Sequence, residues 1–212
     1  MERSAGLDAA LIRAVIIIHA VGFVGLAIPT TQPIFLALVP YHLLTMFGIL
    51  IFSYTGKLSK VLFLALILFI LGYIAEYIGV HTEILFGKYA YGPTLGFSVA
   101  GIPLVMGINW FALIYAAGIV LSTKLENLLL RILIGAALLV LLDVLIEPIA
   151  IKFNYWHWNE GIVPILNYVC WFIVASMFLG IFELFRFQSQ NRLTLVFLIT
   201  QFVFFALLNF VI

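Results

Sequence analysis

Seven long apolar segments separated by short polar links leave this chain essentially one kind of fold. Each segment approaches or exceeds the roughly 20 residues that cross a bilayer as a helix. The chain is 66% hydrophobic and 9% charged, and its mean hydropathy of +1.27 excludes a soluble domain. We predict an all-α, polytopic integral membrane helix bundle, a single transmembrane domain over 1–212, with about seven transmembrane helices at 9–28, 33–54, 60–80, 101–122, 128–149, 165–185 and 193–212.

The basic residues are distributed unevenly between the two sides of this seven-span arrangement. Only Lys88 and Lys152 fall on the side of the longer connections. Since basic residues concentrate on the cytoplasmic side of membrane proteins, we predict a cytoplasmic N-terminus. Because no cleavage site precedes or follows the first apolar segment, we expect no cleavable signal peptide. The other basic residues share the predicted cytoplasmic side: Arg3, Arg13, Lys57, Lys60, Lys124, Arg131, Arg186 and Arg192.

Composition and motifs exclude several classes of function. A net charge of +1 gives no basic surface for nucleic acid, and the single cysteine, Cys170, rules out a disulfide within one chain and a cysteine-based metal site. The sequence contains no HExxH, Walker, GxGxxG or serine-elbow motif. Asp143 and Glu147 only weakly resemble an Asp-rich motif that binds diphosphate through Mg²⁺, because no second such motif is present. We therefore predict neither a metal nor an organic cofactor.

Three carboxylates stand out because they lie inside or at the ends of predicted membrane helices. Glu76, Asp143 and Glu147 fall at similar depth on the side away from the basic residues. Asp143 and Glu147 are four residues apart and therefore share one helix face. An ionisable group at membrane depth is costly and usually faces the interior of a bundle. We predict that these three residues form a site.

Other polar side chains reach the same depth. His42, Asn109, Asn167 and Tyr168 are placed there by the predicted helices, close to the two longer connections. Purely structural roles are alternatives for these residues. His42 could bond a backbone carbonyl freed by Pro40, and the two asparagines could be interhelical hydrogen-bond links. For the carboxylates, the alternatives are an ion pair of Glu76 with Lys88 or Lys152, and solvation of Glu147 at a helix end.

Two further groups of residues have simpler expected roles. His19 lies in the middle of the first helix without an obvious partner. Tyr155, Trp156 and Trp158 are typical of aromatic residues at a membrane interface. Acid–base chemistry on a lipid-soluble substrate is then what the buried acids can perform, one acid donating a proton while another accepts one.

Several motifs resemble the carotenoid biosynthesis membrane family, which includes the CruF-type carotenoid hydratases. The family pattern leads us to expect a glycine where this chain has Glu83. The resemblance spans about residues 70–175 and rests on Glu76-Tyr77-Ile78-Gly79-Val80-His81-Thr82, Phe86-Gly87-Lys88-Tyr89-Ala90-Tyr91, Gly101-Ile102-Pro103, Asn109-Trp110, Asp143 to Pro148, Gly161-Ile162-Val163-Pro164, Asn167-Tyr168 and Trp171.

The resemblance implies a lyase that adds water across the terminal C=C of a linear carotenoid end group without a cofactor. We assign Asp143 as proton donor and Glu76 or Glu147 as the group that orients the water and takes its proton. Tyr89, Trp110 and Trp171 are expected to stabilise the carbocation by cation–π contact, and His42, Asn109 and Asn167 to hold the water, with Tyr168 beside them.

The resemblance also implies partners and a location. The substrate would be gamma-carotene, lycopene or a related polyene held in the lipid bilayer, and other enzymes of the carotenoid pathway are candidate partners. The location would be the prokaryotic cytoplasmic membrane. Three alternatives stay open: a lycopene-type cyclase, which forms the same cation; a proton-coupled transporter; and a carotenoid-binding membrane subunit. The absence of a detectable inverted repeat argues against the transporter.

Overall fold

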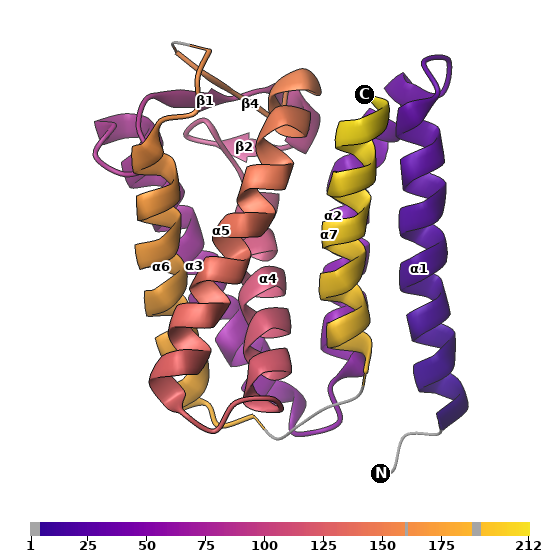
Figure 1. Ribbon diagram of the computed structural model, residues 1–212, viewed down its shortest axis with the longest axis vertical. Helices are drawn as coiled ribbons and strands as arrows, with labels where there is room; N and C mark the ends of the chain where they lie inside the picture. The colour runs from indigo at the N-terminus through magenta and orange to yellow at the C-terminus, as the bar shows by residue number, and fades with distance from the viewer. Residues whose placement is uncertain (1–4, 160, 188–191) are drawn as a thin grey trace.

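A computed structural model describes residues 5–159, 161–187 and 192–212 and confirms the all-α membrane bundle (Figure 1). Within these residues, seven helices are long and apolar enough to cross a membrane. Arg3 and Glu160 lie outside the described residues. The helices are α1 (Ala5–Ala27), α2 (Gln32–Ser53), α3 (Leu58–Thr82), α4 (Val105–Ser122), α5 (Leu128–Lys152), α6 (Ile165–Leu184) and α7 (Leu193–Val211).

All helix ends agree with the prediction within four residues, and the largest shifts are at the starts of α1 and α4 and at the end of α5. α4 begins four residues after 101, because Gly101 takes a left-handed φ of 80° and Ile102–Pro103 forms a strand before it. α5 continues three residues past 149. Pro148 is accommodated inside α5, and the Asn209 amide of α7 donates to the Leu145 carbonyl beside it at 2.8 Å.

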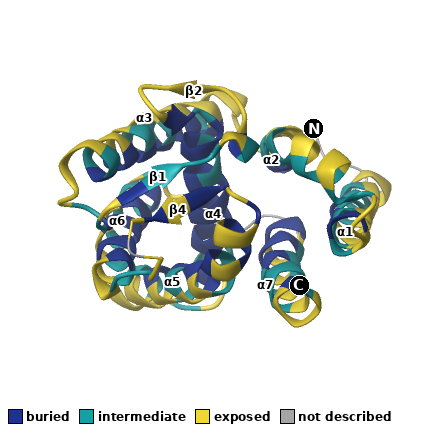
Figure 2. Cartoon of the chain, turned by 90° about the horizontal axis from the view of Figure 1, so that it is seen from above, coloured by how far each residue is buried: buried dark blue, intermediate teal, exposed yellow. Residues whose placement is uncertain are grey.

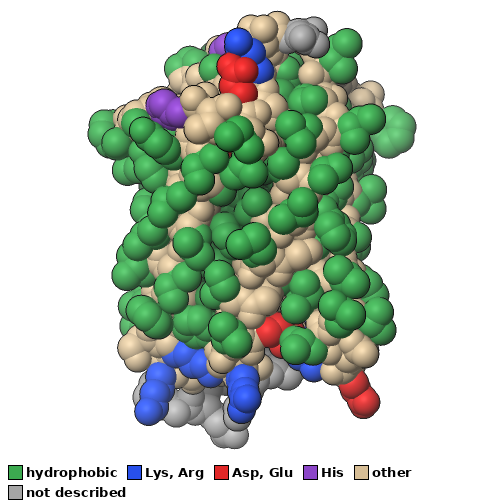
Figure 3. All heavy atoms as spheres, turned by 90° about the vertical axis from the view of Figure 1, so that its left-hand side faces the viewer, with side chains coloured by type: hydrophobic (Ala, Val, Ile, Leu, Met, Phe, Trp, Pro, Cys, Tyr) green, Lys and Arg blue, Asp and Glu red, His purple; other side chains and the backbone are tan. Residues whose placement is uncertain are grey.

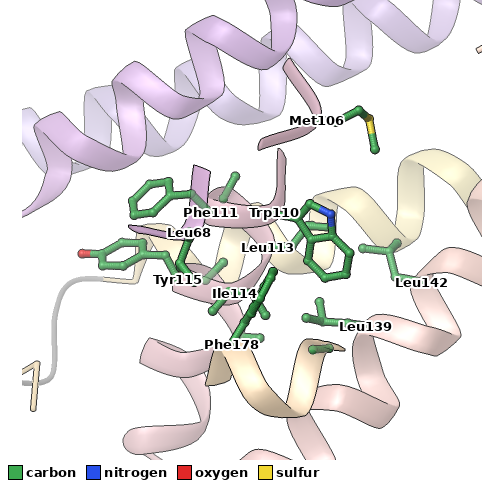
Figure 4. Close-up of a cluster of buried hydrophobic side chains, with 14 of the residues drawn as sticks. Leu68, Met106, Trp110, Phe111, Leu113, Ile114, Tyr115, Leu139, Leu142 and Phe178 are labelled. Atoms are coloured by element: carbon green, nitrogen blue, oxygen red, sulfur yellow. The ribbon is translucent and has the colours of Figure 1, made fainter. Parts of the chain in front are cut away.

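α4 is the central helix of the bundle and the most buried of the seven described spans (Figure 2). Small residues let its neighbours approach closely, as in other membrane bundles. A Cβ on Gly107 would lie 2.7 Å from the Phe69 carbonyl oxygen, and one on Gly72 would lie 2.7 Å from the Trp110 ring. The hydrophobic cluster around α4, drawn in Figure 4, therefore holds Trp110 in a fixed position.

Two short strand pairs cover one end of the bundle, at the top of Figure 1, which we call the strand end. β1 (Tyr89–Tyr91) pairs with β4 (Trp156–Trp158), and β2 (Ser98–Val99) pairs with β3 (Ile102–Pro103), both antiparallel. A 3-10 turn, η1 (Pro93–Leu95), lies between β1 and β2. These strands were not predicted from the sequence. Residues i and i+2 of a strand face the same way, so the pattern places Tyr89 with Tyr91 and Trp156 with Trp158.

The turn that leaves α3 explains the unusual Glu83. This residue has a left-handed φ of 60° at the C-terminal cap of α3, a position where glycine is favoured because it lacks a Cβ. Its carboxylate pairs with Lys88 at 3.1 Å, and both side chains are about half exposed. The replacement of the expected glycine thus affects an exposed turn and leaves the buried acids untouched.

Lys and Arg side chains gather at the end opposite the strands, at the bottom of Figure 3. At that end Arg131 and Glu183 form an ion pair of 2.9 Å between α5 and α6. Between the two charged ends, the surface in Figure 3 is mostly hydrophobic, as a lipid-facing surface requires.

Candidate active site

Two neighbouring cavities lie towards the strand end of the bundle. The larger has a volume of about 460 Å³ and the smaller about 20 Å³, which is room for roughly one water. Met106, Trp156 and Trp171 line both and so form the wall between them. The predicted polar residues divide between the two: Asp143, His42 and Asn109 line the large cavity, and Glu76, Glu147 and Asn167 line the small one.

Glu76 is held by three aromatic donors. Its Oε2 accepts from the Tyr89 and Tyr91 hydroxyls, each at 2.6 Å, and its Oε1 accepts from the Trp110 indole at 2.9 Å. The proposed ion pairs with Lys88 and Lys152 are wrong, because Lys88 pairs with Glu83 and the Lys152 ammonium donates to the Ile212 carbonyl. Burial, reinforced by the charge of Glu76, raises the pKa of Tyr89 and Tyr91 well above its usual value, so both remain hydrogen-bond donors.

Glu147 is held in a similar way by the second strand of the pair. Its Oε2 accepts from the Trp156 and Trp158 indoles at 3.0 and 2.8 Å, and its Oε1 accepts from the Asn167 amide at 3.3 Å. Its side chain is only 2% exposed, so the alternative that it is solvated is wrong. The β1–β4 pair is therefore fixed to the bundle by hydrogen bonds from its aromatic residues to two buried carboxylates.

Asp143 has the least satisfied carboxyl group of the three. Its Oδ2 accepts from the Asn167 amide at 2.8 Å, but its Oδ1 is buried and has no hydrogen-bond partner among the described residues. Asn167 uses its two N–H groups to join Asp143 to Glu147, which confirms an interhelical role between α5 and α6. Within the described residues, no three His, Cys, Asp or Glu side chains gather in a group that could hold a metal ion.

The large cavity is lined mostly by aliphatic and aromatic side chains from six helices, all but α3, and from the strand end. Part of its wall reaches the surface, because Ile17 and Val21 of α1 and Leu38 and Tyr41 of α2 line it and are also exposed. These residues belong to membrane-spanning helices, so the cavity is accessible from the side of the bundle. An apolar molecule in the bilayer could enter without crossing water.

The α1, α2 and α7 side of this cavity carries a second polar group, which we call the histidine cluster: His19 of α1, His42 of α2 and Gln201 of α7. The His19 and His42 rings meet edge to face with centroids 4.7 Å apart. His19 Nδ1 donates to the Val15 carbonyl at 2.8 Å, and the Gln201 amide nitrogen donates to His19 Nε2 at 3.1 Å. The sequence offered no obvious partner for His19, and the structure supplies Val15 and Gln201. Two of the three residues, His42 and Gln201, line the cavity.

The remaining predicted residues have mixed outcomes. Trp110 and Trp171 stack with ring centroids 4.2 Å apart, and Tyr89 lies in the lining of the small cavity. Tyr168 lies half-buried on α6 and belongs to the lining of neither cavity. The role of Trp156 and Trp158 as interfacial aromatics is wrong, since both are buried donors to Glu147.

Sequence reasoning missed four contributors: Tyr91, Trp156, Trp158 and Gln201. The Tyr-Ala-Tyr and Trp-His-Trp alternations could have revealed the first three, because two aromatic residues on one face of a strand next to buried acids are natural donors. Gln201 is a lone amide within an apolar helix, which is a general signal of a polar contact between helices. Nothing in the sequence pairs it with His19, 182 positions away.

Comparison with known proteins identifies a family. A family model described as carotenoid biosynthesis protein matches residues 37–212. This range begins within α2 and includes both cavities' acids, the strand pairs and α7. No curated protein and no solved structure matches the chain significantly.

Proposed function

The chain belongs to the carotenoid biosynthesis protein family, and on this premise we propose that it is a carotenoid hydratase. It adds water across the terminal C=C of a linear carotenoid end group and produces a tertiary alcohol. The substrate is a lipid-soluble polyene such as lycopene or gamma-carotene. Membership of the family supports a role in carotenoid biosynthesis, and the geometry of the site supports protonation of an alkene, the first step of hydration.

The observation that carries the proposal is the bare Oδ1 of Asp143 at an apolar cavity. Because Oδ2 already accepts the Asn167 amide, a carboxylic proton is best placed on Oδ1. A charged carboxylate is costly to bury without a basic partner, and no described Lys or Arg is paired with Asp143. A neutral acid whose proton has no other acceptor can give it to an alkene.

The reaction proceeds in two steps that balance in protons. Asp143 transfers its proton to the less substituted carbon of the terminal alkene, which leaves a carboxylate and a tertiary carbocation. Water then attacks the cation through an oxygen lone pair, and the resulting oxonium loses one proton. That proton finally returns to Asp143, so the enzyme is regenerated without any oxidation or reduction.

Aromatic rings near the site support the cationic intermediate. The Trp171 ring lines both cavities and stacks on Trp110, and the face of an indole attracts a cation. The Asp143 carboxylate left by the first step supplies the balancing negative charge. Glu76 and Glu147 each already accept three hydrogen bonds, so we propose that they chiefly hold β1 and β4 over the site.

The cavity fits one end of a carotenoid rather than the whole molecule. A polyene end group would lie in the large cavity near Asp143, while the remaining chain would extend between α1 and α2 into the bilayer through the exposed part of the wall. We propose that the protein lies in the prokaryotic cytoplasmic membrane with the basic end of Figure 3 in the cytoplasm.

Expression of the chain in a bacterium that accumulates lycopene tests this function. We expect a more polar pigment that is heavier by one water and keeps its chromophore, because only an isolated terminal alkene is consumed. Pigment masses and absorption spectra measure this directly. An isomer of unchanged mass with altered absorption would establish a cyclase instead, and unchanged lycopene and gamma-carotene would remove the support for either reaction.

A further inference from the structure

His42 and Gln201 of the histidine cluster line the same cavity as Asp143, yet the two reaction steps above assign them no part. Gln201 is only 9% exposed, and His19 only 2%. His42, from α2, packs against His19 edge to face. Burying three polar side chains from three membrane helices beside a largely apolar cavity is costly, which marks the cluster as a candidate for a function in it.

The hydrogen bonds of His19 determine which atoms of the cluster remain free. The Val15 carbonyl can only accept, so His19 Nδ1 carries the hydrogen and Nε2 is the acceptor. Gln201 must therefore turn its N–H towards His19 Nε2, which leaves its carbonyl Oε1 without a donor among the described residues. The His42 ring likewise makes no hydrogen bond with any described residue.

The two free groups are close together and lie at the depth of the proton donor. His42 touches the His19 ring and Gln201 bonds to it, so both contact one imidazole. Counting along the helices, His42 lies about three turns from the strand end of α2, and Gln201 about three turns from that end of α7. Asp143 lies between two and three turns from the same end of α5.

We propose that His42 is the general base of the reaction and that it holds the attacking water together with the Gln201 carbonyl. This inference rests on the proposed hydration. A water that donates one hydrogen to an unprotonated nitrogen of His42 and the other to Gln201 Oε1 directs its lone pair away from both. After attack on the carbocation, the oxonium proton passes to His42 and then returns to the Asp143 carboxylate. His19 is a positioning residue that orients Gln201.

This assignment differs from the expectation that Glu76 or Glu147 takes the proton. Both glutamates line the small cavity, which has room for roughly one water, whereas Asp143 lines the large one with His42. Each glutamate already accepts three hydrogen bonds, while His42 accepts none from the described residues. The small cavity is the competing position for the water, and the test must separate the two.

Hydrogen isotope exchange separates proton donation from water attack. The purified protein in lipid vesicles is given lycopene in D₂O, and both deuterium uptake at the terminal alkene carbon and formation of the alcohol are measured by mass spectrometry. When the cation reverts by returning to Asp143 a hydrogen other than the deuteron just delivered, from the same carbon or from an adjacent methyl group, the alkene retains deuterium without any need for the base. In His42→Leu and His42→Gln we expect exchange to continue, while hydration falls by roughly 10²–10⁴-fold, the usual contribution of a general base.

Each outcome decides the assignment. Hydration within a few fold of wild type in either His42 variant overturns it, and so does the loss of both exchange and hydration in both variants. Selective loss of hydration in Glu147→Gln, with His42→Leu unaffected, would place the water in the small cavity instead. If the wild-type protein shows neither exchange nor hydration, the proposed function itself fails, which is a distinguishable result.

Discussion

Asp143→Asn is expected to abolish formation of the hydrated carotenoid. Asparagine keeps the size of the side chain and an oxygen that can accept the Asn167 amide, so the fold should survive. It has no carboxylic proton to give to the alkene, and loss of a general acid typically lowers the rate by roughly 10²–10⁴-fold. Both deuterium exchange and alcohol formation should fall together, because protonation precedes both.

A matched control distinguishes the loss of the acid from a loss of folding. Glu126→Gln removes a carboxylate from the end opposite the strands, far from either cavity lining, and should leave both rates unchanged. Thermal unfolding in detergent should show a similar midpoint for Asp143→Asn and wild type. A folded Asp143→Asn protein that retains full hydration would remove Asp143 from the mechanism.

Glu147→Leu is expected to lower the stability of the strand end severely. The change leaves the Trp156 and Trp158 indoles and one N–H of Asn167 without their acceptor. Each buried donor left unsatisfied costs about 1–3 kcal/mol, so the summed loss is comparable with the whole stability of many proteins. Thermal unfolding in detergent measures the loss, and proteolysis within the connection that carries β4 shows where the structure opens.

The matched control here is Glu147→Gln, which keeps one acceptor oxygen for the two indoles. It should be destabilised less than Glu147→Leu, because fewer donors lose their partner. Glu83→Gln, at an exposed ion pair, should change stability very little. Equal stability of Glu147→Leu and wild type would show that this carboxylate does not anchor β4.

The sequence was informative about the helices and about which polar residues approach one another. Hydropathy alone predicted seven spans. In lipid, every backbone N–H and C=O must form a hydrogen bond within the protein, and a long apolar segment achieves this most simply as a helix. The depth of Asp143, Glu147 and Asn167 followed from helix positions, and the structure brings these three together. His42 and Asn109 also reach the cavity that Asp143 lines. Periodicity and depth therefore sufficed for neighbours at one level of the bundle.

The parts that could not be predicted depend on contacts between distant segments. Gln201 finds His19 only because α7 returns beside α1, and helix order around a bundle is not encoded in hydropathy. The same holds for the donors of Glu76 and Glu147, since the pairing of β1 with β4 joins two connections that are separated by two helices. The partition of the polar residues between two cavities likewise depends on Met106, Trp156 and Trp171, whose packing has no signal in the sequence.

The source of the oxygen in the product tests the central claim most directly. Purified protein in lipid vesicles should be given lycopene in water enriched in oxygen-18, under ordinary oxygen, and the product examined by mass spectrometry. If the chain hydrates a carotenoid, the product gains one water whose oxygen is oxygen-18. A product that carries no label, or one with the mass of the substrate, would contradict hydration and require a different reaction at this site.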